Sequence, residues 1–173
     1  RKLPISSDDE SSIQPRFFIQ NGFCLLGFLA LCLMVSGIGG AITATSVDTW
    51  YQTLQKPTFN PPDWVFAPVW NTLYILMAIA GWRVWLQERS TIRRRALIIF
   101  AIQLGFNLAW SFLFFGLQRI DWALADVLVL LLLIVNNNIL FWRVDRLAGV
   151  LFSPYVIWVV YATILNASLW LLN

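Results

Sequence analysis

The side chains in this sequence that are most suited to binding a ligand or doing chemistry are aromatic rings rather than acids, bases or nucleophiles. The chain contains ten tryptophans, thirteen phenylalanines and four tyrosines, but no histidine. Imidazole ligation of zinc, copper or haem iron is therefore excluded, and so is any histidine-based catalytic triad. Flat aromatic walls instead suit stacking on a flat ligand, with each contact adding on the order of 1 kcal/mol. We predict no catalytic residue and no metal site.

The aromatic residues are especially dense between residues 45 and 68, a segment that also holds four of the seven prolines. Proline lacks a backbone N–H and keeps the preceding residue out of the helical region, so an ordered loop is predicted here. Several aromatic side chains of the loop would be costly in water unless they pack against something: Trp50, Tyr51, Phe59, Trp64 and Phe66. We expect the loop to fold back over a helix bundle and to cap a cavity.

The rest of the chain is too apolar for a soluble domain. Hydrophobic residues make up 59% of the 173 residues and charged residues 12%, with a mean hydropathy of +0.70, whereas soluble domains average about 25% charged residues. The predicted fold class is all-α, a polytopic membrane protein with a five-transmembrane-helix bundle in residues 17–173 after a disordered polar tail over 1–16. Each span is long enough to cross about 30 Å of hydrocarbon; the predicted spans are 17–43, 68–87, 96–117, 122–142 and 154–172.

The basic residues are divided unequally between the two sides of this bundle. Ten of the twelve fall on the side of the N-terminus, and only Lys56 and Arg119 fall on the other. Because cytoplasmic loops carry the excess of Lys and Arg, the N-terminus is predicted to be cytoplasmic, with the 45–68 loop and the C-terminus on the opposite face. The basic residues follow the membrane topology, so nucleic acid is not an expected partner.

Several polar residues fall inside the apolar spans. Gln103 and Asn107 are four residues apart and project from one face of a helix, and Asn166 lies midway along the last span. Such side chains need hydrogen-bond partners in lipid. They either join helices to one another or face a ligand. In the run 136–138, three consecutive asparagines, at least one is expected to face a neighbouring helix.

Three separated segments resemble one known family. Residues 50–74 read WYQTLQKPTFNPPDWVFAPVWNTLY, which closely resembles the signature of the TspO family, also called tryptophan-rich sensory proteins or translocator proteins. The third predicted span is similar to the family's third helix, and the last span to its fifth. The matches there are Gln103, Leu104, Asn107, Trp110 and 114–116, and then Pro154, Tyr155, Trp158, Ala162, Leu165, Asn166 and Trp170. The resemblance covers about residues 17–173.

The resemblance implies a five-helix bundle with a cavity under the first loop. It implies binding of porphyrin, haem or another tetrapyrrole as a ligand, with no obligatory cofactor, for transport, sensing or regulation of tetrapyrroles. Two alternatives are a light-dependent porphyrin-degrading enzyme and a sterol or lipid transporter. The family's animal members carry a basic cholesterol motif after the fifth helix, and its absence here argues against the sterol role. A homodimer through the third helix is also implied, along the small-residue stripe Ala101, Gly105 and Ala109.

Thirteen residues are predicted to bind the ligand, because they match the family's loop and cavity positions or are polar within the spans. They are Trp50, Tyr51, Phe59, Trp64, Trp70, Tyr74, Gln103, Asn107, Trp110, Trp158, Tyr161, Ala162 and Asn166. Lys56 either meets solvent at the membrane interface or pairs with a ligand propionate. Four further tryptophans near span ends are predicted to anchor the bundle at the headgroups: Trp82, Trp85, Trp122 and Trp142.

Overall fold

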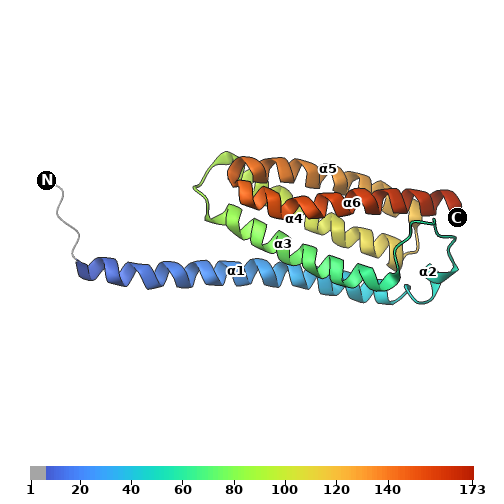
Figure 1. Cartoon of the computed structure of the whole chain (residues 1–173), viewed down its shortest axis with the longest axis horizontal. Helices are drawn as coiled ribbons and strands as arrows, with labels where there is room; N and C mark the ends of the chain where they lie inside the picture. Colours follow the sequence, from blue (N-terminus) through green and yellow to red (C-terminus); the bar gives the residue numbers. More distant parts are fainter. Residues whose placement is uncertain (1–6) are drawn as a thin grey trace.

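A computed structural model describes the backbone of residues 7–173 and the side chains from Asn21 onward, and the described chain is helical without strands (Figure 1). Five helices are long and apolar enough to cross a membrane, which confirms the predicted fold class. The elements are α1 (Ser7–Ala44), α2 (Trp50–Thr53), the 3-10 turn η1 (Asp63–Val65), α3 (Phe66–Leu86), α4 (Thr91–Ser111), the π-helical turn η2 (Phe112–Gly116), α5 (Ile120–Val144) and α6 (Arg146–Leu172). The chain is therefore a multi-pass protein of the lipid bilayer.

The first helix begins earlier than the sequence predicts. The helix of α1 starts at Ser7, where the sequence indicates a disordered tail until residue 16, and residues 1–6 of that tail lie outside the described part. A polar composition keeps a segment out of the bilayer but does not prevent helix formation, and Pro15 is the only proline within α1. Figure 1 shows this end of α1 extending past the other helices. The apolar part of α1 spans Asn21–Ala44.

The last helix also begins earlier than predicted, at Arg146 instead of Pro154. Asp145 caps it, because its Oδ1 accepts a hydrogen bond from the Ala148 N–H at 3.0 Å. Pro154 then lies inside α6, so residues 146–153, which the predicted spans left outside any helix, are helical. In α3, by contrast, the proline lies in the first turn, since Pro68 is the third residue of that helix, a position where the missing N–H of proline has no helical partner to lose.

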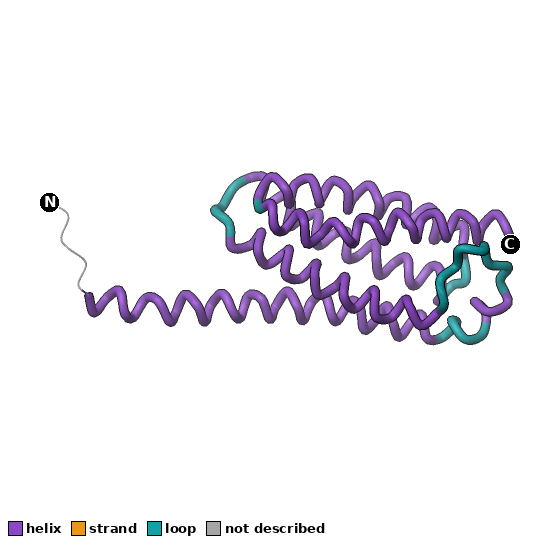
Figure 2. The backbone as a smooth tube through the Cα atoms, viewed as in Figure 1, coloured by secondary structure: helices purple, strands orange, loops and turns teal. Residues whose placement is uncertain are grey.

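The five long helices form a closed ring by their neighbour contacts, and Figure 2 shows them running along one common direction. Helix α3 packs against α1 on one side and α6 on the other, α6 packs against α5, α5 against α4, and α4 returns to α1. The two short turns, between α3 and α4 and between α5 and α6, lie at one end of the ring. The long segment that contains α2 and η1 lies at the other end with the C-terminus (Figure 1).

The half of the ring near the two short turns is sealed by phenylalanine. Phe141 contacts Phe100 at 6.0 Å between ring centroids and Phe152 at 5.0 Å, which joins α4, α5 and α6. All three side chains are buried. This part of the bundle between α4, α5 and α6 is therefore filled by aromatic side chains.

The structure resolves where the asparagine run and the small-residue stripe lie. Asn138 Nδ2 donates to Ser153 Oγ on α6 at 3.3 Å, so the expectation that one of the three asparagines faces a neighbouring helix is confirmed. Ala101 and Gly105 lie on the exposed side of α4, a placement compatible with the dimer, which stays a prediction. The cytoplasmic orientation of the N-terminus also stays a prediction.

Candidate functional site

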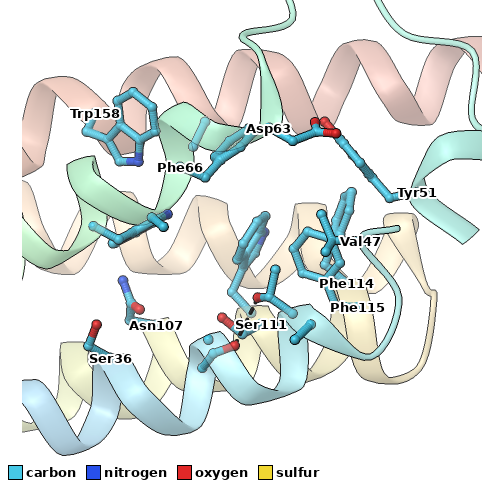
Figure 3. A pocket seen from close by; sticks show the side chains of 18 of the residues that line it. Ser36, Val47, Tyr51, Asp63, Phe66, Asn107, Ser111, Phe114, Phe115 and Trp158 are labelled. Carbon is cyan, nitrogen blue, oxygen red and sulfur yellow. Dashed lines mark hydrogen bonds between the residues drawn. The ribbon is translucent and has the colours of Figure 1, made fainter. Parts of the chain in front are cut away.

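A cavity of about 450 Å³ lies between the helices directly under the long segment (Figure 3). This volume falls in the range of small-molecule sites, roughly 300–1,000 Å³. Four of the five long helices and the segment itself contribute to its wall. The lining residues are Ser36, Gly37, Gly39, Gly40, Thr43, Ala44, Val47, Tyr51, Asp63, Phe66, Ala67, Trp70, Asn71, Tyr74, Asn107, Trp110, Ser111, Phe114, Phe115, Trp158, Ala162, Leu165, Asn166 and Leu169.

The α1 wall of the cavity is built from small residues. A Cβ atom added at Gly39 would lie 3.3 Å from the Ser111 Oγ, so the two helices α1 and α4 approach closely there. A Cβ added at Gly37 or Gly40 would meet no atom within 4 Å. On a helix of 3.6 residues per turn, Gly40 falls at the middle of the lining face of α1. The missing side chains of this wall therefore leave room for a ligand.

The opposite walls carry three tryptophans from three helices. Trp70 on α3 and Trp158 on α6 meet edge to face, with ring centroids 6.5 Å apart and planes at 88°. Trp110 on α4 stacks on Phe114 of η2, with centroids 5.2 Å apart and planes at 24°. The π-helical turn η2 contributes both Phe114 and Phe115 to the lining, as such turns often do at functional sites. The cavity is thus walled by fixed aromatic planes.

Only a few polar groups reach this cavity, and most are already paired. The Trp110 Nε1–H donates to Asn166 Oδ1 at 3.0 Å, and Asn166 Nδ2 donates to the Ile120 carbonyl at 3.1 Å. Trp158 is different, because its buried Nε1–H has no hydrogen-bond partner among the described residues. An unpaired buried donor costs free energy, so a ligand acceptor at this atom would be stabilising.

The floor of the cavity is a buried hydrogen-bond network. Tyr74 Oη donates to Asn107 Oδ1, Asn107 Nδ2 donates to Tyr155 Oη at 2.9 Å, and Tyr155 Oη donates to Gln103 Oε1 at 2.9 Å. Each of the four side chains is at most 4% exposed. The network joins α3, α4 and α6, and it separates the cavity from the phenylalanine layer.

The roof is the long segment, which is held to the bundle by its own contacts. Ser46 Oγ donates to the Phe115 carbonyl at 2.7 Å, and the Tyr51 ring packs on Phe114 and Phe115. Tyr51 Oη donates to Asn60 at 2.8 Å. Burial, followed by the nearby Asp63 carboxylate, raises the pKa of Tyr51 to about 12, so its hydroxyl remains a donor at neutral pH. The predicted folding of the loop over the bundle is confirmed at Tyr51, which is 3% exposed.

Two further contacts fasten the outer part of the roof to α6. Tyr161 Oη donates to the Phe59 carbonyl at 2.8 Å, and the two rings meet edge to face at 6.3 Å. The Asn173 side chain accepts from the Gln55 N–H at 2.9 Å and donates to the Gln55 carbonyl at 3.1 Å.

Tyr161→Phe removes one of these fastenings and is expected to loosen the roof. Because the hydroxyl is partly exposed, the free energy of unfolding should fall by less than about 1 kcal/mol, while residues 55–62 become less protected. Hydrogen exchange of the backbone amides measures this, with exchange in residues 55–62 expected to rise severalfold and exchange in α4 unchanged. Equal exchange in both proteins would show that Tyr161 does not fasten the roof.

The structure brings eight of the thirteen predicted ligand-binding residues to the cavity wall: Tyr51, Trp70, Tyr74, Asn107, Trp110, Trp158, Ala162 and Asn166. The other five lie elsewhere. Trp50 packs behind the wall against Phe114, Gln103 lies below the floor in the hydrogen-bond network, and Tyr161 fastens the roof. Phe59 and Trp64 lie on the outside of the roof, 46% and 75% exposed. At the membrane interface an indole is tolerated in this position, so Trp64 does not need the packing that the sequence suggested.

The α1 wall was missed by the sequence prediction. The sequence did contain an indication of this wall, because the small residues Ser36, Gly40 and Ala44 recur at a spacing of four residues. The same spacing is equally typical of simple packing between helices. Phe114, Phe115 and Phe66 were missed as well, since no feature of their sequence separates a lining phenylalanine from a core one. Among the described residues, no group of three or more His, Cys, Asp or Glu side chains could hold a metal ion.

Comparison with known proteins identifies relatives of this chain. The pattern of the TspO/MBR family matches residues 28–171. The chain is 43% identical over 148 residues to the tryptophan-rich sensory protein of Cereibacter sphaeroides, covering 86% of this chain and 90% of that protein. It is 42% identical over 139 residues to protein CrtK of Rhodobacter capsulatus, covering 80% and 86%. It is 33% identical over 148 residues to the translocator protein of Bos taurus, covering 84% and 87%. With this match across five membrane helices and the cavity beneath the first loop, the chain belongs to the TspO/MBR family.

Proposed function

We propose that the cavity binds a flat, hydrophobic ligand, and that the ligand class is a porphyrin-type tetrapyrrole. The observation that carries this proposal is the convergence of three indoles on one cavity, one of them with an unpaired N–H. Rings at steep angles to one another, such as Trp70 and Trp158, offer a face to a macrocycle and an edge to its rim. Transport, sensing and regulation of the tetrapyrrole are the roles that follow. The relatives named sensory and translocator proteins support this range.

The charges near the cavity favour one orientation of such a ligand. Among the residues that the structure describes, no lysine or arginine lines the cavity, and Asp63 is the single charged lining residue. Carboxylate groups of a tetrapyrrole are costly to bury without a partner, so they should point toward the roof. Lys56 lies there, with its Nζ 4.2 Å from the centre of the Tyr51 ring and 2.9 Å from Gln52 Oε1. The predicted pairing of Lys56 with a propionate belongs to this proposal.

A fluorescence titration tests the proposal. Protoporphyrin IX added to the protein in detergent should quench tryptophan emission in a saturable way. Trp158→Phe removes the unpaired N–H and part of one wall, so the dissociation constant should rise roughly tenfold. Trp122→Phe is the matched control, because that tryptophan is 59% exposed and lies outside the cavity. Linear quenching without saturation, or the same affinity in both variants, would contradict the proposal.

A further inference from the structure

The end of the bundle away from the cavity carries a dense set of exposed arginines. They belong to the two short turns and their flanking helix ends, and we call them the arginine face: Arg89, Arg94, Arg95, Arg143 and Arg146. Within the part of the chain whose side chains are described, none of the five forms an ion pair. Among the side chains described from Asn21 onward, the opposite end has only Lys56 and Arg119 as basic residues, and Arg119 is paired with Asp121 at 2.7 Å.

The acids near the arginine face do not compensate its charge. Asp145 is paired with Arg83 at 2.8 Å and also accepts from the Gln87 side chain at 3.0 Å. Burial of Asp145 opposes its ionisation, but the hydrogen bonds from the Ala148 N–H and from Arg83 outweigh it and lower its pKa. Asp145 is thus ionised and fully engaged at neutral pH. Glu88 is the one further acid among the described side chains of this end.

The same contacts hold the two turns together as one surface. Arg83 and Gln87 belong to the end of α3, and Asp145 joins α5 to α6. Arg93, at the start of α4, donates from Nη2 to the Trp85 carbonyl at 2.7 Å, and its guanidinium lies 5.0 Å from the centre of the Trp85 ring. The exposed arginines therefore stand on backbone segments that are fixed relative to one another.

Exposed tryptophans place this surface at the height of the lipid headgroups. Trp85 and Trp142 are 46% and 43% exposed at the ends of α3 and α5, and indoles in this position are typical of the membrane interface. The phosphate groups of the leaflet are then the anions nearest to the arginines. We propose that the arginine face binds the phosphate groups of anionic phospholipids. A general positive charge would only orient the helices, whereas fixed guanidinium groups select and retain particular lipids.

The test compares arginine variants in lipid bilayers of defined charge. The protein is reconstituted in nanodiscs of phosphatidylcholine or of phosphatidylcholine mixed with phosphatidylglycerol, and the co-purified lipid is counted by native mass spectrometry. The wild-type protein should enrich phosphatidylglycerol over its bulk fraction. Each arginine near an anionic surface contributes about fivefold to the preference, so Arg94→Gln combined with Arg143→Gln should lower the enrichment by more than tenfold.

Two arms of the experiment can overturn the proposal. Arg119→Gln is the control at the opposite end, and an equal loss of enrichment per charge in this variant would show that only net charge matters. Thermal denaturation provides the second arm, because phosphatidylglycerol should raise the unfolding temperature of the wild-type protein and not of the double variant. If inorganic phosphate added to phosphatidylcholine nanodiscs gave the same rise, the site would bind free phosphate and the assignment to a lipid would be wrong.

Discussion

Gly40→Leu is expected to weaken protoporphyrin binding at least tenfold while leaving the protein folded and slightly more stable than the wild type. Gly40 lies at the middle of the α1 wall, and a Cβ atom added to it meets nothing within 4 Å. A leucine side chain can therefore extend into the cavity without displacing any backbone. Glycine within a helix is less favourable than other residues by about 0.5–1 kcal/mol, so the backbone itself gains stability. Binding and stability should change in opposite directions.

The matched control is Gly27→Leu. Gly27 lies on the same helix, also has nothing within 4 Å of an added Cβ, and lies outside the cavity. Its substitution changes helix propensity and hydrophobicity in the same way but leaves the cavity open. Fluorescence titration and the unfolding temperature are measured for both variants. Unchanged affinity in Gly40→Leu would mean that the ligand does not occupy the space beside α1.

Tyr155→Phe is expected to lower the free energy of unfolding by about 2 kcal/mol. Tyr155 is 1% exposed, and its hydroxyl is the partner of both Asn107 Nδ2 and Gln103 Oε1. Phenylalanine keeps the shape of the side chain but leaves both amides with an unpaired buried group. Single hydrogen bonds between membrane helices typically contribute about 0.6 kcal/mol, and the larger value follows because two are lost at one site.

Unfolding in mixed micelles with increasing sodium dodecyl sulfate measures this loss. Tyr161→Phe serves as its control, because it removes a partly exposed hydroxyl from the same helix and should cost less than half as much. Similar small losses in the two variants would show that the floor network does not stabilise the bundle.

The main lines of the fold could be predicted from the sequence because lipid imposes a simple rule. A long apolar run must form a helix, so the number of spans and their approximate positions follow from hydropathy alone. The helix ends depend on single interactions instead. The last span was predicted to start at Pro154, whereas α6 starts at Arg146, where Asp145 caps it by accepting a hydrogen bond from the Ala148 N–H.

The candidate site was predictable where its residues are unusual for a membrane span and unpredictable where they are ordinary. Indoles on three helices and Asn107 or Asn166 within apolar runs are conspicuous, and all of these line the cavity. Gly37 and Gly40 look like packing residues in any sequence, and only the three-dimensional arrangement shows that nothing fills the space beside them. Gln103 is the opposite case. It is a conspicuous polar residue, but it belongs to the hydrogen-bond network below the cavity and does not line the cavity itself.

The structure of the complex with protoporphyrin IX tests the central claim most directly. The account predicts the macrocycle beneath the 45–68 segment, in contact with Trp70, Trp110 and Trp158, with its carboxylates toward Lys56. A macrocycle bound on the lipid-facing surface of the helices, with this cavity empty or filled by other side chains, would contradict it.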